Sequence, residues 1–232
     1  MMQTPLAVEA IELSKTVSSN GNELSILSKL NLAISHSERV AIVGSSGSGK
    51  STLLSLLAGL DSPTSGKVLI SQENISAQDE DGRAALRAKY MGFVFQSFQL
   101  LPSLTALENV MLPLQLTGKA NARAIALEAL EKVGLADRLT HYPKQLSGGE
   151  QQRVAIARAF APKPAILFAD EPTGNLDAVT GERIIDLLFS LNEVANTTLV
   201  LVTHDMTLAK RCERILHLKS GHFTEADIEA GA

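Results

Sequence analysis

The sequence predicts an α/β fold, and three observations support this class. A glycine-rich loop at residues 44–51 joins a short apolar run to a segment with helical character. Further short apolar runs and amphipathic stretches follow it along the chain, as expected for strands and the helices that cover them. The first third of the chain reads mainly as strands, which predicts a separate antiparallel layer. With 232 residues, the chain is long enough to bury one substantial core and a smaller helical lobe.

The antiparallel layer is predicted from three segments. Residues 6–13 alternate between apolar and polar side chains, and residues 26–34 repeat the pattern after a turn at 20–22. Residues 68–70 extend the layer. Half-buried strands of this kind form a sheet with one face on the core.

The glycine-rich loop reads Gly-Ser-Ser-Gly-Ser-Gly-Lys-Ser and satisfies every position of the phosphate-loop pattern. The strand 40–43 precedes it and the helix 52–58 follows, which disfavours a merely flexible Ser/Gly loop. The glycines let backbone N–H groups face phosphate oxygens, and the positive end of the helix points to the same place. Lys50 is predicted to reach the outer phosphates and Ser51 to bind Mg²⁺. The predicted nucleotide-binding residues of this segment are Gly44, Ser45, Ser46, Gly47, Ser48, Gly49, Lys50, Ser51 and Thr52.

A short apolar strand at 165–169 ends in two acids, Asp170 and Glu171. Ligands of open α/β sheets bind at the carboxyl ends of the strands, so Asp170 is predicted to lie beside the phosphate loop and hold magnesium. Strand geometry turns Glu171 to the opposite side, where it could orient or deprotonate a water molecule. Ordinary surface acids are the alternative, and the phosphate loop argues against them.

The segment 146–153 predicts a second anion site. Ser147 followed by Glu150 at the third position is a capping box at the start of a helix. Gly148 and Gly149 leave the amides of the first turn exposed, and capping alone would not require these glycines.

This segment resembles the signature of the ATP-binding-cassette (ABC) ATPases, Leu-Ser-Gly-Gly followed by an acidic or polar residue and Gln-Gln-Arg. The resemblance covers residues 6–223 and includes Gln96 and His204, each after a strand, and the run 174–177. Residues 170–177 and 93–110 look like the subfamily of lipoprotein-releasing, macrolide-efflux and cell-division ATPases. Within that subfamily, residues 92–98 and 186–192 are most similar to the YbbA-type ATPases.

The resemblance implies the P-loop NTPase fold of ABC ATPases, with a mixed central sheet, an antiparallel β layer and a helical lobe that carries the signature. Residues 1–232 would form a single nucleotide-binding domain. Its RecA-like core is expected at about 1–90 and 160–224, and the lobe at about 97–160.

The remaining elements are predicted from periodicity and turn signals. Helices are expected at 79–89, 105–117, 121–133, 178–192 and 206–211, and strands at 92–95 and 198–202. Thr105 and Glu108 predict another capping box, and Pro113 is expected to kink or end that helix. The C-terminal hairpin is predicted at 215–218 with its turn at 219–221, and the tail from residue 225 is expected to fray.

The resemblance also implies a mechanism. Two copies would sandwich two ATP molecules, each held by one phosphate loop and by Ser147, Gly148 and Gly149 of the other copy. The implied catalytic residues are Glu171, His204, Lys50 and Gln96. The implied magnesium ligands are Ser51, Gln96 and Asp170. Asp177 would bridge the two sites, and Val17 occupies the place where many relatives stack an aromatic residue on adenine.

Bulk properties agree with an ATPase subunit at the cytoplasmic face of the inner membrane. The net charge is −4, and no basic block suggests nucleic acid. The N-terminus lacks a signal-peptide pattern, and no apolar stretch reaches the ~18 residues that span a bilayer, so membrane association is expected through a permease. The single cysteine, Cys212, is expected to be a small buried residue.

Three functions of different classes remain open from the sequence. An ATPase subunit that drives a permease is favoured. A soluble ABC ATPase acting on ribosomes or DNA would usually carry two cassettes or a long coiled coil, whereas only the stretch 52–145 separates the two motifs here. A small-molecule kinase would have no use for residues 146–150. Part of an apolar cluster after Gln96 is predicted to receive the permease, with core packing as its alternative. The cluster consists of Phe98, Leu100, Leu101, Pro102 and Leu104.

Overall fold

The computed structural model describes residues 6–19 and 22–224. The chain forms two compact units, which are described separately: the first contains residues 1–90 and 198–232, and the second contains residues 91–197. Asn20 and Gly21 of the predicted turn, the N-terminal residues 1–5 and the predicted fraying from Glu225 lie outside the described residues.

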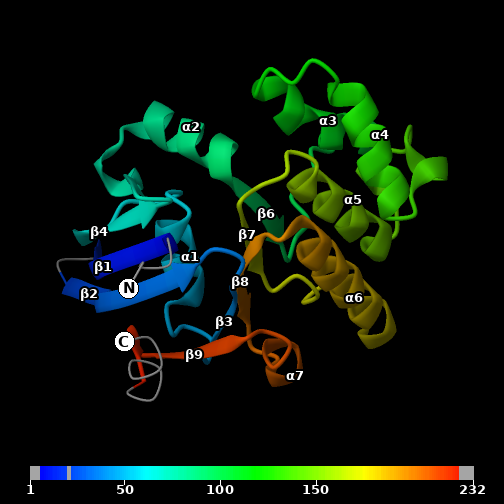
Figure 1. The fold of residues 1–232 in the computed structure, drawn as a ribbon. Coiled ribbons are helices and arrows are strands. Elements are labelled where there is room, and N and C mark those ends of the chain that lie inside the picture. The colour runs from blue at the N-terminus through cyan, green and yellow to red at the C-terminus, as the bar shows by residue number, and fades with distance from the viewer. Residues whose placement is uncertain (1–5, 20–21, 225–232) are drawn as a thin grey trace. The chain divides into compact units, whose positions relative to one another are not determined.

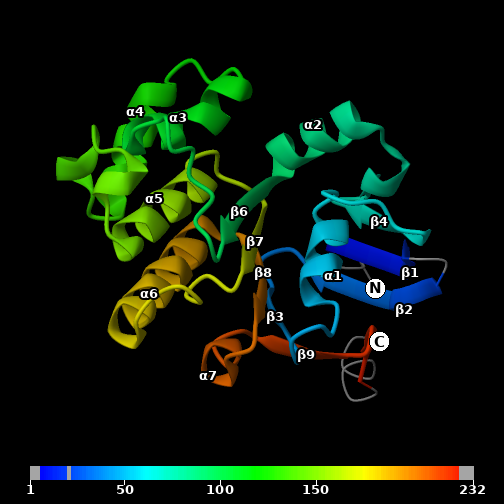
Figure 2. The same ribbon diagram turned by 180° about the vertical axis from the view of Figure 1, so that it is seen from behind.

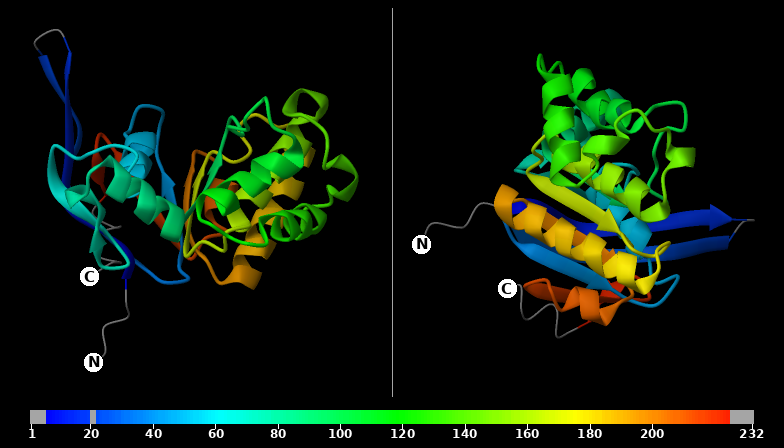
Figure 3. Two further views of the ribbon diagram at one scale, coloured as in Figure 1. Left: turned by 90° about the horizontal axis from the view of Figure 1, so that it is seen from above. Right: turned by 90° about the vertical axis from the view of Figure 1, so that its right-hand side faces the viewer.

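The first unit contains the predicted antiparallel sheet (Figures 1 and 3). Its strand order is β2-β1-β4-β5. The strands are β1 (Leu6–Ser19), β2 (Asn22–Ser35), β4 (Ser65–Ile70) and β5 (Glu73–Asn74). The strict alternation predicted for residues 6–13 is wrong, because the pairing of β1 shifts between Ala10 and Leu13, and Glu12 has a φ of 49°. Such a bulge inserts an extra residue and reverses the faces of the side chains that follow.

The first unit also contains a mixed sheet of order β10-β9-β3-β8. Its strands are β3 (Arg39–Val43), β8 (Thr198–Thr203), β9 (Arg214–Lys219) and β10 (His222–Phe223). Strand β3 is parallel to β8 and to β9, and its residues 40–43 are buried. Because parallel strands end at one edge of a sheet, the segments that follow β3 and β8 leave from the same edge.

The helices of the first unit are short. They are α1 (Lys50–Leu57), α2 (Glu80–Tyr90), α7 (Met206–Ala209) and the 3-10 turn η1 (Ile75–Ala77). The last of these helices was predicted to reach residue 211, but it ends at Ala209. Asp205 caps it, accepting hydrogen bonds from the N–H groups of Thr207 and Leu208.

The second unit contains four helices and two parallel strands (Figure 2). The strands are β6 (Met91–Phe95) and β7 (Ile166–Asp170), and the helices are α3 (Ala106–Leu116), α4 (Ala122–Lys132), α5 (Gly148–Phe160) and α6 (Ala178–Ala195), with the 3-10 turns η2 (Ala136–Arg138) and η3 (Pro143–Gln145). Helix α5 is central and contacts β6, α3, α4 and α6. A Cβ on Gly92 would lie 2.6 Å from the Ala159 carbonyl oxygen, so glycine permits the close packing of β6 on α5.

Helix α3 confirms its predicted capping box. The N–H of Glu108 donates to Thr105 Oγ1 at 3.3 Å, and the N–H of Thr105 donates to the Glu108 carboxylate at 2.8 Å. Pro113 does not end the helix, which continues to Leu116. Val110 and Leu114, on either side of the proline, are buried, and this packing outweighs the hydrogen bond that a proline cannot donate.

The C-terminal hairpin is confirmed with a tighter turn than predicted. Lys219 belongs to β9, and the two turn residues Ser220 and Gly221 have φ values of 48° and 78°. Positive φ at both positions is typical of a type I′ turn, whose twist matches that of the strands it joins.

Cys212 is half-buried against Ala41, Val43 and Ala209. Burial raises the pKa of its thiol to about 12, so the side chain stays protonated and packs as a small apolar residue. Within residues 6–19 and 22–224, none of the helices combines the length and the apolar character that crossing a membrane requires.

Candidate functional site

The phosphate loop leaves β3 after Val43 and enters α1 at Lys50. Gly47 and Gly49 have φ values of 78° and 102°, which side-chain-bearing residues rarely adopt. Gly49 is the N-cap of α1, so no side chain satisfies the first N–H groups of the helix, and its first turn contains no acid. The positive pole of α1 therefore faces an anion site that the chain itself does not fill.

Lys50 lies inside the loop. Its ammonium group donates to the carbonyl oxygens of Gly44 and Ser45 at 2.8 and 3.0 Å. A phosphate bound in the loop would exchange these neutral acceptors for charged ones, which form stronger hydrogen bonds with an ammonium. Ser45, Ser46, Gly47 and Ser51 are exposed, so this face of the loop is open to a ligand.

His204 lies where the sequence predicts it. Val43 pairs with Thr203 across the parallel strands β3 and β8, so Gly44 and His204 both follow a paired residue at one edge of the sheet. The histidine is exposed rather than partly buried in a strand end. The first unit thus brings together the phosphate loop and a side chain that can donate to a phosphate.

The second unit brings Gln96 and the two acids to one sheet edge. Phe95 pairs with Asp170 across β6 and β7, so Gln96 and Glu171 are the next residues of paired strands. The Gln96 Nε2 donates to Asn175 Oδ1 at 3.2 Å, and Asn175 Nδ2 donates to the Gln96 carbonyl at 3.0 Å. These bonds attach Gln96 to the segment 174–177, a contact that the sequence did not predict.

The strand-geometry argument for Glu171 is wrong. Strand β7 ends at Asp170, and Glu171 has a φ of 45°, outside the extended region. Its carbonyl accepts a hydrogen bond from the Gly174 N–H at 3.0 Å. The turn, and not the alternation of a strand, therefore sets the direction of the Glu171 side chain.

Helix α5 confirms the capping box of the signature. The Glu150 N–H donates to Ser147 Oγ at 3.3 Å, and the Ser147 N–H donates to the Glu150 carboxylate at 2.8 Å. Arg138 Nε lies 3.0 Å from the other carboxylate oxygen. The Ser147 N–H, more than the Ser147 hydroxyl and Arg138, lowers the pKa of the Glu150 carboxyl to about 2. Glu150 is therefore an anion at neutral pH.

Packing gives Gly149 a role besides the amide exposure that the sequence predicted for both glycines. Gly149 is buried, and an added Cβ would lie 2.6 Å from Thr180 Cγ2 of α6. Gly148 is half-exposed, and its Cβ would lie 3.3 Å from Leu176. Gly149 thus lets two helices approach each other, and the expectation of an exposed backbone remains for Gly148.

Asp177 has a structural role that the sequence analysis missed. It is the N-cap of α6 and accepts a hydrogen bond from the Thr180 N–H at 3.0 Å. Hydrogen bonds from Thr180 lower the pKa of the Asp177 carboxyl. An aspartate directly before the predicted helix 178–192 was the signal that could have revealed the cap.

Two polar residues that the sequence analysis missed hold the loop after Gln96. Asn109 is buried, and its side chain accepts from the Leu101 N–H and donates to the carbonyls of Leu101, Leu104 and Thr105. Arg158 of α5 donates to the carbonyls of Phe98 and Gln99 at 3.0 and 2.6 Å. A loop whose carbonyls are fixed in this way presents its side chains in one arrangement.

The side chains predicted to bind magnesium carry oxygen donors of the type that this ion prefers. No group of three or more His, Cys, Asp or Glu side chains that could hold a metal occurs in the described part of the chain. Mg²⁺ does not need such a cage, because it keeps several waters and takes one or two side-chain oxygens together with phosphates. Ser51, Gln96 and Asp170 offer a hydroxyl, an amide and a carboxylate oxygen, which are ligands of this hard type.

Comparison with known proteins agrees with these features. Residues 27–174 match the family model of the ABC transporter. The chain is 56% identical over 220 residues to the ABC transporter ATP-binding protein YbbA of Escherichia coli K12, covering 94% of this chain and 96% of the relative. It is 48% identical over 225 residues to the lipoprotein-releasing system ATP-binding protein LolD of Xanthomonas euvesicatoria, covering 96% and 92%.

A solved structure shows the same fold. The ATP-binding cassette MJ0796, described as a dimer in a post-hydrolysis state bound to ADP and Pi, superposes with a TM-score of 0.87 at 45% identity, covering 94% of this chain and 97% of that one. The expected ABC ATPase fold and the expected lipoprotein-releasing subfamily are therefore confirmed. The chain belongs to the ABC transporter family, as an ATP-binding subunit with ATPase activity.

Proposed function

We propose that two copies of this chain close around two ATP molecules and drive an integral-membrane permease from the cytoplasmic face of the inner membrane. Residues 1–232 act in this proposal as one nucleotide-binding domain. The observation that carries it is the uncapped start of α1 behind the glycine loop, with Lys50 inside that loop. The open alternative of a ribosome- or DNA-associated ATPase has no comparable support.

In the proposed site, the phosphate loop and Lys50 bind the β- and γ-phosphates. Bound Mg²⁺, held by Ser51, Asp170 and Gln96, would neutralise phosphate charge. Glu171 orients the attacking water, and His204 donates a hydrogen bond to the γ-phosphate. The chemistry of each side chain and its place at a strand end support these assignments.

Ser147, Gly148 and Gly149 are proposed to bind the nucleotide of the second copy, and Asp177 to lie between the two sites. The dimeric form of the cassette MJ0796 supports a pair. Within this chain the Glu150 carboxylate already compensates the positive pole of α5 and would repel a bare anion. We therefore expect this helix start to bind an anion whose charge is partly neutralised by cations. A partner's ATP with Lys50 and Mg²⁺ has this property.

The loop 97–104 is the proposed contact with the permease. Leu101 is 44% exposed and Pro102 is exposed, which weakens the core-packing alternative for both. Asn109 and Arg158 fix the backbone beside them. The name of the relative LolD, a lipoprotein-releasing system ATP-binding protein, supports a permease that extracts lipoproteins. Lipid extraction, export or mechanical transmission across the envelope fit the same subunit.

The catalytic assignment is tested with Glu171→Gln. This change keeps the side-chain volume and removes the carboxylate, so the variant should bind ATP, lose turnover and accumulate as an ATP-dependent dimer. ATPase assays and size-exclusion chromatography with ATP measure both effects. Turnover within about twofold of the parent, a barrier change of about 0.4 kcal/mol, would exclude Glu171 as the catalytic carboxylate.

The permease contact is tested with Leu101→Glu, using Leu116→Glu as a matched control. Leu116 is 78% exposed at the end of α3, in the same unit. Copurification with the membrane fraction should be lost only in Leu101→Glu, while both variants bind MgATP like the parent. A strongly lowered melting temperature of Leu101→Glu alone would place Leu101 in the core and move the contact elsewhere.

A further inference from the structure

Parts of β2, of β9 and of the turn after β9 lie directly behind the phosphate loop. An added Cβ on Gly44 would lie 2.3 Å from the Leu218 carbonyl oxygen of β9. A Cβ on Gly49 would lie 2.8 Å from Leu27 Cδ2 of β2. The N–H of Gly221, in the turn between β9 and β10, donates to the Ser48 carbonyl at 3.3 Å. The loop therefore rests on parts of the chain that lie far from it in sequence.

Gly221 is restricted by its conformation and by its neighbours. Its φ is 78°, and an added Cβ would lie 2.4 Å from the Ile26 carbonyl oxygen. Its own carbonyl accepts a hydrogen bond from the Ser28 N–H at 3.2 Å. One glycine thus bonds to β2 on one side and to the phosphate loop on the other.

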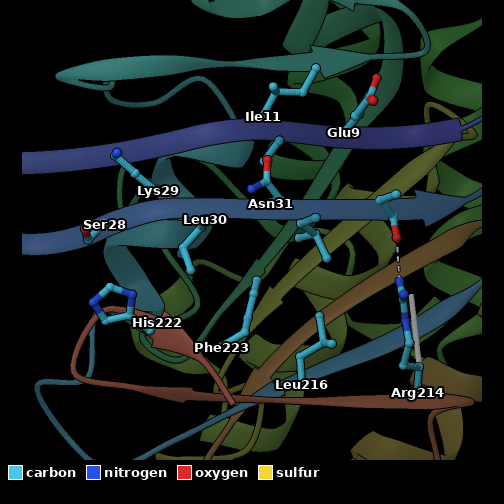
Figure 4. A pocket seen from close by; sticks show the side chains of 13 residues that line it. Glu9, Ile11, Ser28, Lys29, Leu30, Asn31, Arg214, Leu216, His222 and Phe223 are labelled. Carbon is cyan, nitrogen blue, oxygen red and sulfur yellow. Dashed lines mark hydrogen bonds between the residues drawn. The ribbon is translucent and has the colours of Figure 1, made fainter. Parts of the chain in front are cut away.

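The hairpin is held on β2 mainly near its ends (Figure 4). A cavity of about 550 Å³ lies between the hairpin and the strands β1 and β2. At one end Arg214 Nη2 donates to the Ala33 carbonyl at 2.6 Å, and at the other end stands the bond between Ser28 and Gly221. Phe223 projects into the space between them and is 9% exposed. At the turn, the hydrogen bond between Ser28 and Gly221 is the contact that ties the hairpin to β2.

The bond to Ser48 has a geometric consequence for ligand binding. A trans peptide is planar, and its C=O and N–H point in opposite directions. The Ser48 carbonyl is directed at Gly221, so the N–H of Gly49 in the same peptide is directed away from the hairpin. That N–H is among the groups at the uncapped start of α1 that can donate a hydrogen bond to a phosphate oxygen.

We propose that Gly221 is a positioning residue for nucleotide binding, through which the C-terminal turn fixes the Ser48–Gly49 peptide of the phosphate loop. The inference rests on the proposed role of residues 44–52 in holding phosphates. It assigns to the β9–β10 hairpin a function in ATP affinity beyond its place in the sheet. A displaced turn would let this peptide rotate and would weaken the binding of ATP and ADP.

The test compares Gly221→Ala with Gly66→Ala in the full chain. Gly66 of β4 lies in the same unit, has a φ of 82°, and its added Cβ would lie 2.3 Å from the Glu12 carbonyl oxygen. Both variants therefore place a Cβ against a backbone carbonyl. Only Gly221→Ala does so in the turn that hydrogen-bonds to the phosphate loop. Melting temperatures of the two variants measure the shared cost of folding.

In Gly221→Ala the displaced turn should leave the Gly49 N–H misaligned with the phosphate. The Kd and the KM for MgATP should then rise about tenfold relative to Gly66→Ala, with kcat changed less than about twofold. Lower stability alone reduces the active fraction and leaves KM unchanged. Equal affinities of Gly221→Ala and Gly66→Ala for MgATP would overturn the inference.

Amide hydrogen exchange on the unaltered protein provides a second test that does not depend on a variant folding. Saturating MgADP should slow the exchange of the Gly221 amide and leave the Gly66 amide unchanged. A Gly221 amide that exchanges equally fast with and without MgADP would also overturn the inference.

Lys50→Ala distinguishes failure of the proposed phosphate site from failure of the proposed role of the turn. If it binds MgATP like the parent, the proposed phosphate site itself fails. If it loses binding while Gly221→Ala does not, only the role of the turn fails.

Discussion

The two helices that begin at proposed phosphate sites, α1 and α5, start in opposite ways. Helix α1 has Gly49 as its N-cap, without a side-chain cap and without an acid in its first turn. Helix α5 begins at Ser147 with a complete capping box, and the Glu150 carboxylate lies at its positive pole. Arg138 lies beside this carboxylate at 3.0 Å.

The difference separates two kinds of anion site. The N–H groups and dipole of α1 are left for a ligand, so this helix can bind phosphate within one subunit. In α5 the chain satisfies Glu150 N–H internally and compensates the dipole with a carboxylate. Helix α5 is therefore stable without ligand and attracts an anion less strongly, which suits a contact made only when a second subunit closes.

The largest expected effect follows from removing the cation of the first site. Lys50→Ala deletes the only cation of the phosphate loop, and it should weaken MgATP binding by the isolated subunit about 10- to 100-fold, the cost of a charge-assisted hydrogen bond. Ser147→Arg should leave that affinity unchanged and abolish ATPase activity, because it obstructs only closure. Calorimetric titration and ATPase assays measure both quantities. Equal losses of subunit affinity in the two variants would contradict the comparison.

A smaller effect is expected from the charge in the α5 capping box. The pKa of Glu150 is about 2 in the folded protein, below its ordinary value of 4.5, so its stabilising contribution is complete above pH ~4.5 and is lost as the pH falls toward 2. Glu150→Gln should therefore cost about 0.5–1 kcal/mol of unfolding free energy at pH 6, with the deficit shrinking at lower pH. Denaturant unfolding from pH 6 to 3.5 measures this.

Glu108→Gln is the matched control for that experiment. Glu108 occupies the same position in the capping box of α3, where the Thr105 N–H likewise lowers the pKa of its carboxyl. Glu108→Gln should also lower the free energy of unfolding at pH 6, but the substitution should not alter ATPase activity. A Glu150→Gln deficit that grows as the pH falls would have the wrong sign and would refute the assignment.

The smallest expected effect concerns the base rather than the phosphates. Val17 is 38% exposed and pairs across β1 and β2 with Leu24, which is 59% exposed and was missed in the sequence analysis. If this aliphatic surface covers adenine, Val17→Tyr should tighten ATP binding by up to ~1 kcal/mol through ring stacking. The affinity for inorganic tripolyphosphate should not change, because this ligand has no base and can bind only at the phosphate site at the start of α1. Equal gains for both ligands would show that the base does not contact Val17.

Local patterns in the sequence were enough to predict many elements. The capping boxes of α3 and α5 depend on residues three positions apart, and the phosphate loop depends on eight consecutive residues between a strand and a helix. Such features are decided by nearby backbone and side chains, so they can be read before the fold is known. Gln96 and His204 were also expected directly after strands, and β6 and β8 end at the residues before them.

Contacts between distant segments could not be read in this way. The bulge in β1 and the tight approach of Gly149 to Thr180 each depend on what packs nearby. Asn109, Arg158 and Gly221 have ordinary local sequence surroundings, and their roles arise from carbonyl groups that the fold brings within reach. The sequence by itself determined which groups can bind phosphate, because that chemistry is local. The tertiary structure decided which backbone holds those groups in place, because a hydrogen bond between distant segments exists only after both have folded.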